Sequence, residues 1–110
     1  MPSKRALADH AVVFDALGDG TRRAILDQLR RQPCSVAAIA AKQPVSRPAI
    51  SQHLRVLHDA GLVRYREEGT RNIYFIDPDG INAVRSYLDS FWQEALDAFD
   101  DFVRREERKR

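Results

Sequence analysis

The 110-residue sequence contains a single cysteine, Cys34, so an intrachain disulfide is excluded. Such sparing use of cysteine is typical of proteins kept in a reducing compartment. No uninterrupted apolar stretch approaches the roughly 18 residues that a membrane-spanning helix needs. The N-terminal residues also lack the apolar core of a signal peptide. We therefore expect a cytoplasmic protein with no membrane partner.

Motifs of catalysis are missing as well. The sequence has no glycine-rich phosphate-binding loop and no local arrangement of serine, histidine and acid typical of a hydrolase. We therefore expect no catalytic residues, no cofactor and no enzymatic activity. A chain of this length forms one compact domain, so residues 1–110 are predicted to be a single unit.

Charge is distributed unevenly along the chain. Residues 1–76 carry twelve Lys/Arg against seven Asp/Glu, whereas residues 77–103 carry one arginine against seven acids. The last seven residues restore three positive charges, for a net charge of +2. A basic front and an acidic rear favour a polyanionic partner at the front, although solvated helix faces would give the same pattern.

Periodicity and capping residues predict five helices and one β-hairpin, mainly α with a small β component. Glycine, proline and capping side chains mark the helix ends. The expected helices cover residues 7–17, a segment from Asp19 or Thr21 to about 30–31, residues 35 to 41 or 42, residues 47–60, and about 80–105.

Residues 36–62 form the outline of a DNA-binding helix-turn-helix, with the motif itself at about 36–60. A short helix is followed by a break at Gln43-Pro44-Val45 and by a longer helix that Ser46 caps. Ile50, Leu54 and Leu57 recur at three- and four-residue intervals and are expected to face the core. A helix in the major groove presents its remaining side chains to base edges and phosphates.

The side chains on the other face of this helix are the candidate DNA contacts. Arg47 is suited to guanine and Gln52 to adenine, because each can form two hydrogen bonds with that base. Hydroxyl groups suit phosphate oxygens, and His53 is expected either to contact phosphate or to pack. The predicted contacts in this motif are Ser46, Arg47, Pro48, Ser51, Gln52, His53 and Arg55.

Residues 63–76 change to the two-residue period of strands and are predicted to form a hairpin, the wing of a winged helix-turn-helix. The turn is expected at residues 68–72, where Gly69 allows a positive φ. Arg64, Arg66 and Arg71 are predicted to contact phosphates or a minor groove. A solvated hairpin edge protected by charge is the alternative.

The last predicted helix carries a wide apolar and aromatic stripe that needs to be covered. A second copy of the chain is the expected cover, and folding back onto its own domain is the alternative. Two copies would place their recognition helices about one DNA turn apart. The stripe comprises Ile81, Val84, Tyr87, Leu88, Phe91, Trp92, Ala95, Leu96, Phe99, Phe102 and Val103.

Three segments together resemble the ArsR/SmtB family of bacterial winged-helix repressors. They are F-x-A-L-G-D-x-T-R at 14–22, S-x-H-L-x-x-L at 51–57 and A-G-L-V at 60–63, within a similarity that covers about residues 10–77. The resemblance implies a homodimer that binds double-stranded operator DNA and releases it on a signal. It also implies an interface of the first and last helices, expected at Leu7, Val13, Phe14, Leu88, Phe91, Trp92, Ala95 and Phe99.

The chain departs from the metal-sensing members of the family that it resembles. Those members carry thiolates where this chain has Ser35, Ala37 and Ala40, and they use histidines on the last helix, which has none here. His53 and His58 lie five residues apart, about 140° around a helix, and do not converge on one ion. We therefore expect no metal site.

Other functions compete with DNA-dependent repression as explanations of these patterns. A winged helix that binds another protein is one alternative, but it would not need the arginines at 47, 55, 64, 66 and 71. RNA binding is another, but it would favour exposed aromatic side chains at the hairpin tip, which the sequence does not place there. A redox response through Cys34, or a small-molecule response through an aromatic pocket near Tyr87, Phe91 and Trp92, remains an alternative. The expected effector is unknown.

Overall fold

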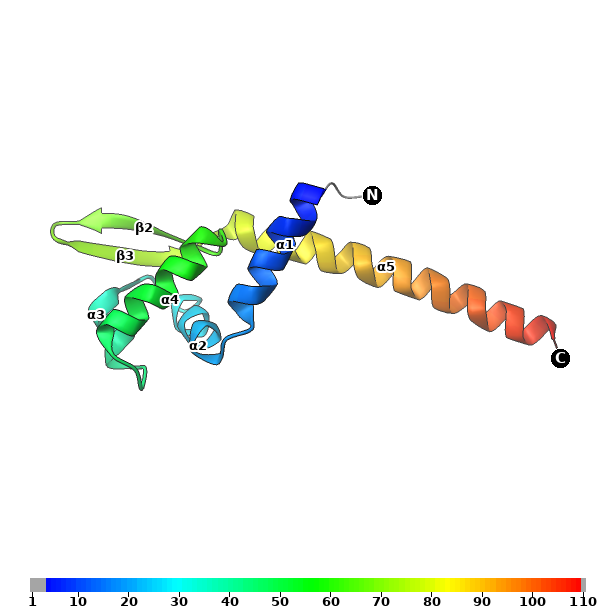
Figure 1. The fold of residues 1–110 in the computed structure, drawn as a ribbon, viewed down its shortest axis with the longest axis horizontal. Coiled ribbons are helices and arrows are strands. Elements are labelled where there is room, and N and C mark those ends of the chain that lie inside the picture. Colours follow the sequence, from blue (N-terminus) through cyan, green and yellow to red (C-terminus); the bar gives the residue numbers. More distant parts are fainter. Residues whose placement is uncertain (1–3, 110) are drawn as a thin grey trace.

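A computed structural model describes the backbone of residues 4–109 and the side chains of residues 10–109. Helices and strands follow in the order α1 (Lys4–Leu17), α2 (Gly20–Leu29), β1 (Cys34–Ser35), α3 (Val36–Ala41), α4 (Arg47–Asp59), β2 (Val63–Glu68), β3 (Arg71–Ile76) and α5 (Pro78–Arg108). The three central helices and the hairpin form one body, and α5 projects far from it (Figure 1).

This arrangement confirms the predicted winged helix-turn-helix, with one addition. The sheet has three antiparallel strands in the order β1-β3-β2, because Cys34 and Ser35 pair with Tyr74 and Ile73 of β3. The prediction of a two-stranded hairpin was therefore incomplete. A strand of two residues is too short to show the alternation by which strands are recognised in a sequence.

Side-chain caps begin the three central helices. Asp19 accepts a hydrogen bond from the backbone N–H of Arg22, so it is the cap of α2 rather than Thr21. Ser35 and Ser46 accept in the same way from residues three positions further on, at the starts of α3 and α4. Each cap satisfies a backbone donor that the first turn of a helix leaves free.

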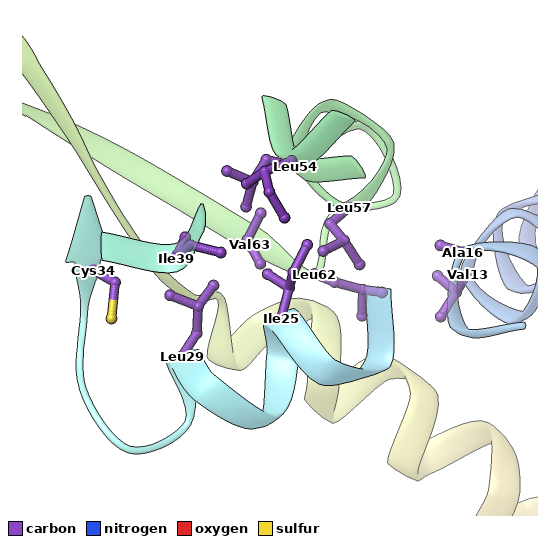
Figure 2. Packing of buried hydrophobic residues seen from close by; sticks show 11 residues of the cluster. Val13, Ala16, Ile25, Leu29, Cys34, Ile39, Leu54, Leu57, Leu62 and Val63 are labelled. Atoms are coloured by element: carbon purple, nitrogen blue, oxygen red, sulfur yellow. The ribbon is translucent and has the colours of Figure 1, made fainter. Parts of the chain in front are cut away.

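The core lies between α2, α3, α4 and the base of the hairpin. Ile50, Leu54 and Leu57 of α4 are fully buried, as their spacing predicted. They pack with Ile25 and Val63, and Val13 and Ala16 of α1 extend the same cluster (Figure 2). This packing fixes which face of α4 is turned inward and leaves the opposite face for other contacts.

The end of α4 is closed by Gly61, whose φ of +79° suits glycine. The N–H of Gly61 donates to the carbonyl of His58, and the N–H of Leu62 donates to that of Leu57. This pair of bonds is the Schellman motif that commonly ends helices at glycine. Strand β2 follows at once, and the N–H of Asp77 donates back to the carbonyl of Leu62. The start of α5 is therefore bonded directly to the end of the helix-turn-helix.

The turn of the wing is shorter than predicted. Strand pairing continues to Glu68 and Arg71, which leaves Gly69 and Thr70 as the whole turn instead of residues 68–72. Gly69 has a φ of +60° and no described non-glycine residue has a positive φ, so only the first central position is left-handed. That pattern is typical of a type II′ hairpin turn.

Helix α5 begins two residues before the predicted start. Asp77 caps it by accepting a hydrogen bond from the N–H of Asp79. Pro78 occupies the first turn, where the N–H that proline lacks would have no acceptor within the helix. Its 31 residues span about 46 Å. None of these residues is buried, although the stripe includes Leu88, Phe91, Trp92 and Phe99.

The residues predicted for a dimer interface differ in exposure. Phe14, Leu88, Phe91, Trp92, Ala95 and Phe99 are exposed, whereas Val13 is buried in the core of its own protomer. Val13 therefore packs α1 against the core of its own protomer, and its side chain is not available to a second copy. The side chain of Leu7 lies outside the described residues.

Among the described helices, none combines the length and apolar character required to cross a membrane.

Candidate nucleic-acid interface

The outward face of α4 carries most of the predicted DNA contacts. Its side chains are turned away from the core that Ile50, Leu54 and Leu57 define. Among the described residues, none pairs with Arg47, Gln52 or Arg55 through a hydrogen bond or ion pair. The exposed members of this face are Ser46, Arg47, Pro48, Ser51, Gln52 and Arg55. These groups are free to bond a ligand.

Ser46 has a role within the protein already. Its hydroxyl oxygen accepts the N–H of Ala49 at 3.3 Å. The hydroxyl hydrogen is left to donate, so Ser46 can cap α4 and still contact an acceptor such as a phosphate oxygen. Pro48 lies within the first turn and donates no backbone hydrogen bond.

The pairing register places the three wing arginines on one face of the hairpin. Arg64 lies opposite Phe75, Arg66 opposite Ile73, and Arg71 opposite Glu68. Directly opposed residues of antiparallel strands point to the same side. Arg66 forms an exposed ion pair with Glu68 at 3.4 Å, whereas the structure shows no such partner among its described residues for Arg64 or Arg71. Arg64 and Arg71 are therefore the wing arginines that can bind a phosphate without breaking an ion pair.

His53 is positioned differently from the other candidates. It is half-buried, with its Nδ1 3.4 Å from a guanidinium nitrogen of Arg22 and 4.0 Å from the Asp19 carboxylate. The backbone N–H of Arg22 lowers the pKa of Asp19 below its ordinary value of 3.8, and the nearby Arg22 and His53 charges act in the same direction. Asp19, Arg22 and His53 form a polar cluster that connects the start of α2 with the middle of α4.

Arg22 is the member of this cluster for which the sequence predicted no structural role. Its Nε donates to the carbonyl of Ala16 at 2.7 Å, and its terminal nitrogen donates to that of Asp15 at 3.1 Å. The side chain thus bonds the end of α1 while contacting His53 of α4. A sequence signal existed, because an arginine in the first turn of a helix is disfavoured by the helix dipole. Its presence there calls for another role.

We expect Arg22→Ala to lower the free energy of unfolding by about 2 kcal/mol, because a part-buried charged hydrogen bond to the carbonyl of Ala16 and an exposed one to that of Asp15 are removed. Arg23→Ala is the matched control. Arg23 is exposed and donates only to the carbonyl of Leu17, so its removal is expected to cost about 0.5 kcal/mol. Urea unfolding at one protein concentration measures both. Equal effects of the two substitutions would contradict the role assigned to Arg22.

The structure also bears on the effector alternatives. In residues 10–109, no three His, Cys, Asp or Glu side chains gather in a way that could hold a metal ion. Cys34 is buried and its Sγ lies 3.4 Å from the carbonyl oxygen of Gln32. Phe91 and Trp92 are 60% and 62% exposed in the single protomer, so α5 alone does not enclose a pocket at these side chains.

Comparison with known proteins places these features in a family. Residues 19–65 match the family described as "Bacterial regulatory protein, arsR family". The chain is 49% identical over 90 residues to the HTH-type transcriptional regulator Rv2034 of Mycobacterium tuberculosis, covering 82% of this chain and 84% of that protein. Both matches span the helix-turn-helix.

Solved structures agree with this similarity. An ArsR-like transcriptional regulator from Rhodococcus sp. RHA1 superimposes with a TM-score of 0.72 at 34% identity, covering 87% of this chain and 93% of that one. The homodimeric winged helix-turn-helix DNA-binding domain Mb0332 from Mycobacterium bovis gives a TM-score of 0.66 at 34% identity, covering 88% and 93%. The fold and the sequence are therefore both similar to those of ArsR-type transcriptional regulators.

Proposed function

Because the chain belongs to the arsR family of bacterial regulatory proteins, we propose that it is a homodimeric repressor whose paired α4 helices bind a pseudo-palindromic operator. The chain is a DNA-binding transcriptional regulator by its family and its relatives. The dimer, the symmetry of the operator and the direction of regulation are the proposed parts. Repression is supported by similarity to the transcriptional repressor SdpR of Bacillus subtilis, at 32% identity over 80 residues.

One observation carries the proposal. The exposed face of α4 presents Arg47, Ser51, Gln52 and Arg55, with no partner for the arginines or Gln52 among the described residues. Guanidinium, hydroxyl and amide groups are those that bind base edges and phosphates in a major groove. A face that served only to keep the helix soluble would gain from ion pairs along the helix, and none is present within residues 47–59 other than that of His58 with Asp59.

The single chain would divide this work among its parts. Residues 36–60 supply the helix-turn-helix, residues 63–76 the wing, and α5 the contact with a second copy. In this proposal α4 determines sequence preference, and Arg64, Arg66 and Arg71 hold phosphates or a minor groove beside it. His53 takes a positioning role through Arg22, with at most one ring nitrogen left for DNA.

Binding of the purified protein to DNA tests the proposal. Fluorescence anisotropy with the DNA upstream of its own gene, and selection from a random-sequence pool, are expected to reveal one preferred pseudo-palindrome. Affinity should fall steeply with salt, because phosphate contacts release counterions. If neither source of DNA bound in a salt-dependent way, the proposal would be wrong.

Arg47→Ala and Gln52→Ala are expected to reduce sequence discrimination. Each substitution removes a bidentate pair of hydrogen bonds and with it about 1–3 kcal/mol of preference for the correct base pair. The measurement compares affinity for the selected operator with affinity for single-base variants of it. Arg108→Ala is the control, because Arg108 is exposed at the end of α5 and lies about 180° around the helix from Ile81. A reduction confined to non-specific affinity would show that these side chains bind only the DNA backbone.

Arg71→Ala is expected to act differently, weakening all DNA sequences alike. Arg71 is exposed beside the wing turn and is suited to binding a phosphate. Its removal should reduce the slope of log affinity against log salt by about 1 for each phosphate that is no longer neutralised. Arg108→Ala again controls for net charge. An unchanged slope together with altered base preference would assign Arg71 to base recognition instead.

A further inference from the structure

The outer part of α5 bears a second exposed apolar surface, separate from the part near α1. We call residues 96–103 the distal segment; its sequence is LDAFDDFV. Phe99 and Phe102 are 62% and 54% exposed, and this end of the helix projects beyond every other element (Figure 1). Aromatic side chains at this exposure call for a cover. The segment also contains three aspartates and no cation.

A groove of matching character lies at the other end of α5. We call it the α2 groove: it is a shallow, open depression of about 370 Å³, lined by Arg23, Leu26, Asp27, Arg30, Ile76 and Ile81. Leu26, Ile76 and Ile81 supply an apolar floor. Arg30 forms an ion pair with Asp27 at 2.7 Å, so Arg23 leaves the rim with a net positive charge. An acidic segment with large apolar side chains is complementary to it.

The dimer proposed above brings the two surfaces together. Helices α1 and α5 meet where His10 and Phe14 contact Tyr87. Among residues 10–109, the exposed apolar side chains closest to this contact along each helix are Val12, Phe14, Leu88, Phe91 and Trp92. Phe14 contacts Tyr87 at this crossing, with ring centroids 5.6 Å apart. A two-fold axis through this patch would bury the exposed apolar side chains of α1 and of α5 in the same interface. An antiparallel pair of α5 helices also opposes their dipoles favourably and keeps the two winged bodies apart.

The register of that pair follows from counting. In an antiparallel pair, residues equally far from the two-fold axis face each other. Leu88 follows Ile81 by seven residues, so an axis beside Leu88 places Ala95 of a second copy opposite Ile81. Trp92 follows Ile81 by eleven residues, so an axis there places Val103 opposite Ile81. An axis beside Leu88 thus falls one residue short of the distal segment, whereas every axis from Asp89 to Trp92 places a residue of the distal segment opposite Ile81.

From this juxtaposition we propose that the distal segment of each α5 docks in the α2 groove of the other copy. Phe99 and Phe102 cover Leu26, Ile76 and Ile81, and the neighbouring Asp100 faces the arginine rim. The inference rests on the proposed homodimer and adds a second contact region outside the α1–α5 crossing. Each protomer would then hold its partner beside the helix-turn-helix as well as at the axis.

Cross-linking between singly substituted proteins tests the docking directly. In a background of Cys34→Ala, one protein carries Ile81→Cys and the other carries Phe99→Cys or Phe102→Cys. After mixing and subunit exchange, a short bis-maleimide is expected to link them into a covalent dimer. Ser51→Cys on the exposed face of α4 is the control, and it should give no link to Phe102→Cys.

The outcomes separate the docking from the dimer itself. A cross-linked Ile81–Phe102 or Ile81–Phe99 dimer supports the inference. A dimer by sedimentation that gives no such link overturns the docking and leaves the proposed function intact. Efficient linking of Phe102→Cys to itself would indicate parallel α5 helices and also overturn it. A monomer at micromolar concentration would overturn both proposals.

A substitution gives an independent measure. Phe102→Asp should raise the dimer dissociation constant by roughly 30-fold, as expected when a docked aromatic side chain is removed from an interface. Ser90→Asp is the matched control, because it adds the same charge about 180° around α5 from Ile81. That control should leave the constant unchanged. Equal effects of the two substitutions would show that charge, and not docking of Phe102, is responsible.

Discussion

Replacing Phe91 and Trp92 with aspartate is expected to convert the protein to a monomer and to lower operator affinity about a thousandfold. These side chains are 60% and 62% exposed in the protomer, so the substitutions leave its core intact. A charge on each of two central interface positions would have to be desolvated in the dimer, at a cost that the interface cannot recover. The monomer then lacks the second α4, whose linkage raises affinity by about 10²–10⁴ without any new contact.

Sedimentation equilibrium and anisotropy with full and half operators measure this prediction. The matched control is Ser90→Asp with Gln93→Asp, which adds the same charge at the two flanking exposed positions. The control should remain dimeric and bind the full operator normally. Affinity for an isolated half operator should be the same for all three proteins. Full operator affinity in a monomeric variant would show that pairing of α4 helices is not needed.

Gly80→Ala is expected to destabilise the protein by about 3 kcal/mol. A Cβ on Gly80 would collide with the backbone carbonyl group of Gly61. Gly61 is held by the Schellman bonds that end α4, so neither backbone can move without breaking hydrogen bonds. Overpacking at a rigid contact typically costs about 1–3 kcal/mol and sometimes more. The start of α5 should separate from the winged body.

Urea unfolding at a fixed protein concentration measures this destabilisation, since dimer formation contributes to apparent stability. Gly20→Ala is the control, because a Cβ there meets only a guanidinium nitrogen of Arg23 at an ordinary 3.7 Å. Its stability should stay within about 0.5 kcal/mol of the original. If Gly80→Ala were equally tolerated, the close packing of α5 on the end of α4 would not hold in solution.

Helix α4 could be predicted from the sequence because its capping residues and its apolar spacing indicate the same helix. Ser46 caps α4, Gly61 ends it, and the inward spacing of Ile50, Leu54 and Leu57 fixes its rotation. Those signals act within a few residues of one another. The exposed positions of Arg47, Gln52 and Arg55 then follow without knowledge of the rest of the fold.

The parts that sequence did not reveal depend on contacts between distant segments. The segment 77–80 has the composition of a turn, yet Pro78 and Gly80 lie inside the first turns of α5. Glycine is favourable there only because the backbone of Gly61 packs against it. Likewise β1 exists only through its pairing with β3, and the bonds of Arg22 depend on where α1 ends. The role of these residues requires the tertiary structure.

The short connections between elements have a consequence for the arrangement of the operator. Asp77 alone separates β3 from α5, and its N–H is bonded to Leu62 at the other side of the hairpin. Without a flexible linker, the axis of the proposed dimer would set the separation and phase of its two α4 helices. One extra base pair between half-sites would rotate the second by about 35° and shift it by about 3.4 Å. The proposed dimer would therefore suit operators of one fixed spacing, and we expect natural sites to vary in their bases far more than in the length of the central spacer.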